Sequence, residues 1–265
     1  MKQPRIFSTD LLPTLNNREE YFERITQEDR APRIVLGQYL SLVMFTFFYG
    51  AVMGSYHSWQ QALSSGIKVS VLFTLALLIC FPAFFIIQYI LGSRLRLVPM
   101  IAIILTGFVL MAAVMVAFAP IIVIFLLTGS NYYFLQLLHI AVFILAGFFG
   151  MQTVAAALKF ACEKRNVYPQ TGVVVFRFWV VILAFVGIQL AWNFRPFLGD
   201  RGEPFQLFRH YEGNFYTALI YSAKQLFSEE PDGEAVSDDT LTYEAIQGET
   251  PPDSAALRRL LDGEG

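Results

Sequence analysis

The sequence predicts an all-α protein, a polytopic transmembrane helical bundle with five spans. Of its 265 residues, 55% are apolar and only 15% are charged, whereas soluble domains carry about 25% charged residues. The mean hydropathy is +0.52, and five long apolar runs between positions 34 and 192 nearly exclude charge. A run of about 18 such residues is long enough to cross a membrane as a helix. The runs lack the regular polar face of soluble helices, which argues against a large soluble core.

The five expected spans are residues 34–53, 69–91, 97–127, 132–158 and 172–192. Near the end of the first span, Gly50 and Gly54 form a pair of small residues four positions apart. Such pairs allow two helix backbones to approach closely, so we expect this part of the span to contact another span.

An amphipathic helix is expected in the polar amino-terminal tail, residues 1–33. It runs from Arg18 to about Arg30, with Asn17 as its N-cap. Its apolar face consists of Tyr21, Phe22 and Ile25. We expect the helix to lie on the membrane or to pack against the loops. We expect no cleavable signal sequence in this tail, so the first span is expected to target the protein to the membrane.

The basic residues near the spans predict the orientation. They concentrate in the tail and in the loops expected at 92–96 and 159–171, whereas the opposite loops have only Lys68. Because cytoplasmic loops carry the excess of Lys and Arg, we expect a cytoplasmic amino terminus and an external carboxyl terminus in a bacterial-type inner membrane. Arg195, Arg201 and Arg209, which follow the last span, count against this orientation.

Two segments follow the fifth span. Residues 193–227 are aromatic and mixed in charge, and we expect them to form an interfacial cap over the bundle. The cap motif consists of Arg195, Pro196, Phe197, Gly199, Arg209 and Asn214. Residues 228–265 are acidic and poor in large apolar side chains, which predicts a disordered tail.

Three polar residues within the expected spans are candidate functional residues: Arg177, His139 and Gln189. Arg177 lies five residues into the fifth span, where an arginine either reaches the headgroups, pairs with another group or lines a pathway. His139 has no second ligand one helical turn away, so a hydrogen bond to a neighbouring helix is favoured over a metal site. Gln189, like Gln88, Gln136 and Gln152, is expected to form hydrogen bonds between helices.

The sequence contains no recognisable catalytic motif, and Cys80 and Cys162 resemble neither a disulfide framework nor a metal site. We therefore expect no enzyme activity, cofactor, metal or nucleic-acid partner. The favoured function is a scaffold or accessory subunit with the lipid bilayer, a membrane-protein partner or a second copy as its partners. The alternative is a small transporter or channel that acts as an oligomer, with Arg177 on the pathway. A lipid enzyme using Arg195, Arg201, His210 and Glu212 comes third.

Three segments of the chain carry a resemblance to a known family. They are residues 195–199, Arg-Pro-Phe-Leu-Gly, with Pro204, Phe208, Arg209, Gly213 and Asn214 beyond them, the glycine-rich stretch from Gly50 to Ser55, and residues 63–68, Leu-Ser-Ser-Gly-Ile-Lys. On these segments, residues 34–227 resemble a group of uncharacterised bacterial multi-span membrane proteins. In span number and polar amino-terminal tail, the chain is also similar to Yip1-type membrane proteins. Neither resemblance implies catalytic residues.

Overall fold

A computed structural model describes residues 21–23, 25, 31–128, 132–163, 169–199, 207 and 220. All of these residues belong to the first of two units in the chain, residues 1–227, and the acidic tail lies outside them. Within this described part the regular structure is helical throughout. The long helices are α2, Ala31–Gly54; α3, Trp59–Ile90; α4, Leu97–Leu127; α5, Tyr132–Glu163; and α6, Gln170–Phe194.

All five helices are long and apolar enough to cross a membrane. Each exposes large apolar side chains, with Leu78 of α3 65% exposed, Phe148 of α5 58% and Phe178 of α6 69%. Apolar surface of this extent suits hydrocarbon rather than water, and helices satisfy their backbone hydrogen bonds internally there. The predicted fold class, a transmembrane helical bundle with five long apolar helices, is confirmed. The chain is an integral membrane protein.

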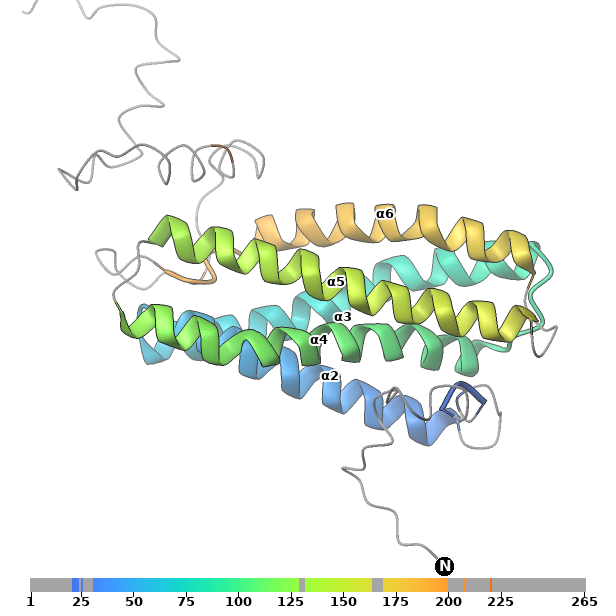
Figure 1. The fold of residues 1–265 in the computed structure, drawn as a ribbon, viewed down its shortest axis with the longest axis horizontal. Coiled ribbons are helices and arrows are strands. Elements are labelled where there is room, and N and C mark those ends of the chain that lie inside the picture. Colours follow the sequence, from blue (N-terminus) through green and yellow to red (C-terminus); the bar gives the residue numbers. More distant parts are fainter. Residues whose placement is uncertain are drawn as a thin grey trace, which may run out of the picture. The chain divides into compact units, whose positions relative to one another are not determined.

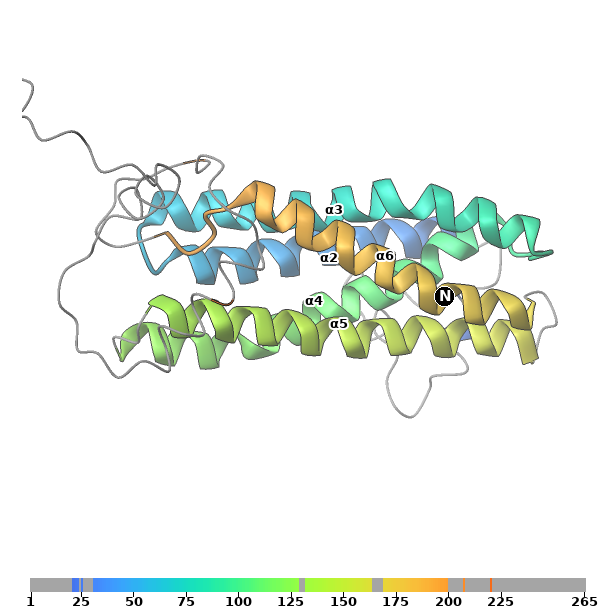
Figure 2. The ribbon, with the colours of Figure 1, turned by 90° about the horizontal axis from the view of Figure 1, so that it is seen from above.

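The five helices pack as a ring (Figures 1 and 2). Helix α2 packs against α3 and α4, α4 packs against α5, and α6 packs against both α3 and α5. Successive helices run in opposite directions, so α2, α4 and α6 end where α3 and α5 begin. We call this end of the bundle the cap end, because the chain leaving α6 lies there.

Glycines set the closest contacts between helix backbones. A Cβ atom on Gly50 of α2 would lie 2.5 Å from the carbonyl oxygen of Ser65 in α3, and one on Gly54 would overlap the carbonyl of Gln61. The contact expected from this glycine pair is therefore confirmed, and its partner is α3. A Cβ atom on Gly150 of α5 would likewise lie 2.6 Å from the carbonyl oxygen of Gly107 in α4. Both helix pairs are closer than any side chain would allow.

Aromatic side chains fill the interior of the ring. Phe73 of α3 meets Phe108 of α4 edge-on, with ring centroids 6.0 Å apart. Nearer the other end, Phe84 of α3 lies 4.6 Å from Trp179 of α6. The indole Nε1 of Trp179 donates a hydrogen bond of 3.0 Å to the carbonyl of Cys80. These contacts hold α6 against α3 in an interior where the indole N–H needs an acceptor.

Several helix ends differ from the expected spans, most of all the start of α3 and the end of α5. Helix α3 begins at Trp59 rather than at residue 69, because Ser58 is an N-cap whose hydroxyl accepts a 3.2 Å hydrogen bond from the Gln61 amide. Helix α5 continues to Glu163, and α6 begins at Gln170. The expectation that Lys68 and Lys159 lie in loops is therefore wrong. Hydropathy marks the part of a helix that fits hydrocarbon, whereas the backbone hydrogen bonds continue through the polar residues beside it.

The described part of the amino-terminal tail is helical at Tyr21–Glu23 and Ile25. Tyr21, Phe22 and Ile25, its predicted apolar face, are 6%, 3% and 0% exposed. The ring of Phe22 lies 5.9 Å from that of Phe160 in α5. The tail therefore packs against the helices themselves, at the end opposite the cap end. The other residues of the expected 18–30 helix lie outside the described residues.

Candidate functional site

The first turns of α3 carry a stripe of buried hydrogen-bond donors at the cap end. Gln61, Ser65 and Lys68 are 1%, 0% and 5% exposed. Their spacing of four and three residues places them on one face of the helix. These polar residues made the segment look like a loop in the sequence, although the same spacing is typical of one helical face.

The donors of α3 hold the chain that leaves α6. The Gln61 side-chain Nε2 donates 2.9 Å and 3.3 Å hydrogen bonds to the carbonyls of Pro196 and Phe197. The Lys68 ammonium donates a 3.1 Å bond to the Pro196 carbonyl and a second bond to the Leu207 carbonyl. The Ser65 hydroxyl also donates to the Phe197 carbonyl. Carbonyls beyond a helix end have no helical partner, so side chains of α3 supply the donors that their burial requires.

The way α6 ends places the 195–199 part of the cap motif next to these donors. Arg195 has φ −63° and ψ 155°, an extended conformation that ends the helix directly before Pro196. Its guanidinium carbon lies 3.2 Å from the centroid of the Trp192 ring, in a cation–π contact. Gly199 has φ +70°, which turns the chain in a way that side chains disfavour. Arg209 and Asn214, the other residues of the predicted motif, lie outside the described residues.

The three segments that carry the resemblance come together at the cap end. Gly50 and Gly54 contact α3 at Ser65 and Gln61, and those two residues bind the 195–199 segment. A Cβ atom on Gly199 would lie 3.0 Å from that of His57, in the turn between α2 and α3. The 195–199 segment lies more than a hundred residues from the other two along the chain, and its particular partners on α3 could not be predicted from the sequence.

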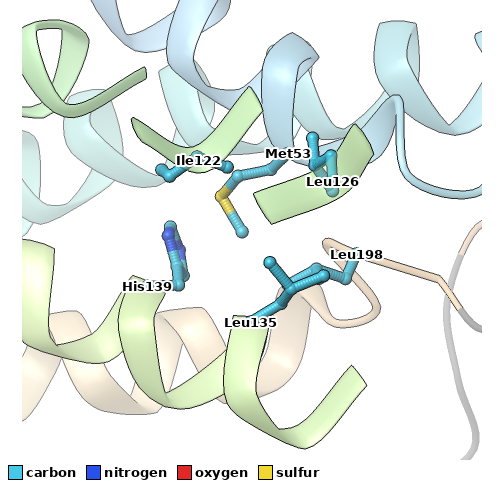
Figure 3. Close-up of a pocket in the computed structure, with 6 residues that line it drawn as sticks. All are labelled: Met53, Ile122, Leu126, Leu135, His139 and Leu198. Carbon is cyan, nitrogen blue, oxygen red and sulfur yellow. The ribbon is translucent and has the colours of Figure 1, made fainter. Parts of the chain in front are cut away.

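Leu198 is one of the residues that line a small cavity at the cap end (Figure 3). It is 7% exposed. The cavity has a volume of about 10 Å³ and is lined by Met53, Ile122, Leu126, Leu135, His139 and Leu198. That volume is close to the least that holds one water molecule. His139 is the one lining residue that carries a polar side chain, so the cavity places a single imidazole beneath Leu198.

His139 of α5 pairs with Tyr49 of α2 inside the ring. The Tyr49 hydroxyl and the His139 Nδ1 atom lie 2.7 Å apart, within hydrogen-bond distance. The two rings are stacked with centroids 5.3 Å apart, and Phe143 meets the imidazole edge-on at 4.6 Å. The predicted hydrogen bond from His139 to a neighbouring helix is confirmed. Tyr49 was missed because a tyrosine in an apolar run gives no sign of its partner.

The other candidate residues of the spans lie on the outer surface. Arg177 and Gln189 are exposed on α6, and Gln152 is exposed on α5. None of the three side chains has a hydrogen bond or an ion pair with the described residues. Another of the amides, Gln88 of α3, is buried, and its Nε2 donates a 3.1 Å bond to the Gly172 carbonyl of α6. The expected hydrogen bond between helices is thus found at Gln88.

A second polar cluster joins the amino-terminal helix to the bundle. The Gln38 side-chain Nε2 donates to the Tyr21 hydroxyl at 3.0 Å and to the Thr106 hydroxyl at 2.8 Å. Burial raises the pKa of the Tyr21 hydroxyl, so the group stays neutral when it packs here. This cluster joins α2, α4 and the tail, and no feature of the sequence singled out Gln38 or Thr106.

Among the described residues, no three His, Cys, Asp or Glu side chains lie close enough together to hold a metal ion. Comparison with known protein families, curated proteins and solved structures finds no match.

Proposed function

We propose that this integral membrane protein is a non-enzymatic scaffold or accessory subunit that binds another membrane protein through α5. The observation that supports this proposal is Gln152, an exposed amide in the middle of a helix surface that faces hydrocarbon. It follows Phe148 and Phe149 by one helical turn, and these side chains are 58% and 45% exposed.

An amide that faces lipid has no partner for its hydrogen bonds, which is costly in hydrocarbon. A transmembrane helix of a partner protein that offers a polar side chain or a free carbonyl would supply one, and such bonds hold helices together in membranes. The apolar side chains around Gln152 would supply the packing. In the interior, by contrast, the Nδ1 atom of His139 and the Nε2 atom of Gln88 already have partners within the bundle.

The proposal is tested by photo-crosslinking from α5 in the native membrane. A photoreactive amino acid in place of Phe148 is expected to capture one reproducible membrane protein, and Gln152→Leu should abolish that capture. The matched control replaces Phe178, an equally exposed phenylalanine of α6, which should not capture the same protein. A capture that persists in Gln152→Leu, or the absence of any reproducible product, would contradict the proposal.

A second candidate function rests on Arg177, whose exposed side chain has no ion pair with the described residues. In an oligomer, several such arginines could line a pathway for anions between copies of the chain. This transporter or channel predicts that flux through reconstituted liposomes is lost in Arg177→Ala while the bundle still folds. Crosslinks from Phe148 to a second copy of this chain would favour this function over the accessory subunit.

We also propose a bacterial inner membrane as the location, with the amino terminus in the cytoplasm and the cap end outside. The supporting observation is the excess of basic residues in the tail and in the loop that contains Arg94 and Arg96.

A further inference from the structure

The residues of α6 are less deeply buried near the cap end than near the start of the helix. The buried residues of α6 are Gly172, Phe176, Trp179 and Leu183, whereas residues 184 to 194 are partly buried or exposed. The last turns of α6 still pack against the core through partly buried side chains, among them Val186, Leu190 and Phe194. Leu198 adds a buried side chain at this end, because it lines the cavity together with residues of α2, α4 and α5.

The segment around Leu198 is fastened from one side only. Its carbonyls at Pro196 and Phe197 accept hydrogen bonds from Gln61, Ser65 and Lys68, all on α3. Among the described residues, no hydrogen bond joins residues 196–199 to α2, α4 or α5, against which Leu198 packs through apolar contact. A segment held by one helix and seated among three others can separate from those three without unfolding any helix.

We propose that residues 195–199 form a plug that closes the cap end of the bundle over the Tyr49–His139 pair, held in place by the donors of α3. With the plug seated, Leu198 separates the imidazole from the aqueous side of the membrane. With the plug lifted, Met53, Leu135 and His139 face that side. The plug does not depend on the scaffold function proposed above, since its parts all belong to this chain.

Thiol labelling of the full chain in a mild detergent tests the plug. The reporter is Met53→Cys, since Met53 is 2% exposed and lines the cavity beneath Leu198. The native Cys80, 4% exposed in the middle of α3, is kept as a reporter of loosening in the whole bundle. A small charged thiol reagent is added, and mass spectrometry of peptides gives the labelling rate at each position.

Leu198→Ala removes most of the side chain that fills the opening. We expect it to raise the labelling rate at position 53 by roughly thirtyfold or more, the lower end of the effect of removing a buried leucine on an opening equilibrium. The rate at Cys80 should stay unchanged. The matched control is Leu127→Ala, at the cap end of α4, where the side chain is 82% exposed and its loss should leave both rates unchanged.

The donors are tested separately with Ser65→Ala combined with Lys68→Met, which should raise the rate at position 53 in the same direction. Three outcomes would overturn the plug. One is labelling at position 53, with Leu198 intact, as fast as at an exposed Gln60→Cys. Another is an unchanged rate in Leu198→Ala. The third is an equal rise at position 53 and at Cys80, which would mean that the whole bundle has loosened. An effect of Leu198→Ala without any effect of the donor variants would overturn the role of α3.

Discussion

At the scale of single residues, the interior of the bundle shows how a polar side chain is accommodated in an apolar environment. The imidazole of His139 lies among Phe143, Met53 and Leu135, and its Nδ1 atom finds the hydroxyl of Tyr49 at 2.7 Å. A buried donor or acceptor without a partner costs more than its hydrogen bond gains. The pair should therefore be more sensitive to the loss of one member than to the loss of both.

Tyr49→Phe is expected to destabilise the protein by about 1–3 kcal/mol, because it leaves the Nδ1 atom of His139 buried without a partner. Adding His139→Phe should recover part of that loss, which a double-mutant cycle measures as coupling between the two sites. The measurement is the free energy of unfolding by denaturant titration in a mild detergent. Tyr89→Phe, at a tyrosine that is 69% exposed, is the control and should change stability by no more than about 0.5 kcal/mol. A Tyr49→Phe protein as stable as the parent would contradict the account.

A hydrogen bond could be predicted from the sequence only where the residue itself carries a polar group that must be paired inside a membrane. His139 and Gln88 carry groups that must find partners in a membrane, so hydrogen bonds between helices were expected at both, and both are confirmed. The identity of each partner could not be predicted, because it depends on which helix faces meet. The alternatives for Arg177 stay predictions, since its exposure on α6 is compatible with reaching the headgroups or with a neighbouring copy.

At the scale of elements, the small residues of α2 decide how closely it packs on α3. In the native chain the backbone of Ser65 occupies the space that a side chain at position 50 would need. Backbone atoms cannot move aside as the end of a flexible side chain can, so the helices themselves would have to separate.

Gly50→Ala is therefore expected to destabilise the protein by about 1–3 kcal/mol through overpacking. The matched control is Gly187→Ala in α6, where a Cβ atom would meet nothing within 4 Å. Because alanine favours helix over glycine, this control should be neutral or stabilising by up to about 1 kcal/mol. Both effects are read from unfolding free energies in the same detergent. Equal effects of the two substitutions would show that the α2–α3 contact is looser than described.

The ends of the helices were predictable only where the chain itself marks them. Helix α4 has the predicted bounds, 97 and 127, because a basic loop precedes it and a threonine and a glycine follow it. Helix α3 begins ten residues before the predicted span. Polar residues in its first turns bind the 195–199 segment. Because the sequence does not show this contact, it also does not show that these polar residues belong to a helix.

At the scale of the whole molecule, hydropathy sufficed for the fold class but not for the order of the helices around the ring. Each helix exposes apolar residues on several sides, so the sequence does not indicate which faces pack together. The resemblance to bacterial multi-span membrane proteins also stays a prediction.

The orientation in the membrane is tested by labelling single cysteines with an impermeant maleimide in intact cells. With Cys80 and Cys162 replaced by alanine, Gln60→Cys at the cap end should be labelled, since Gln60 is exposed there. Arg94→Cys, exposed in the turn between α3 and α4, should be labelled only after lysis. These positions follow from the cytoplasmic amino terminus that the basic residues predict. The reverse pattern would invert the topology.

The position of α6 in the ring has a consequence for biosynthesis. During membrane insertion α2, α3, α4 and α5 emerge before it, and they form a chain of contacts with open ends at α3 and α5. Only α6 joins those two ends. Until it arrives, Phe84 and the carbonyl of Cys80 lack their partner Trp179. Until α6 is inserted, the faces of α3 and α5 that it contacts in the bundle therefore remain uncovered by the other described helices.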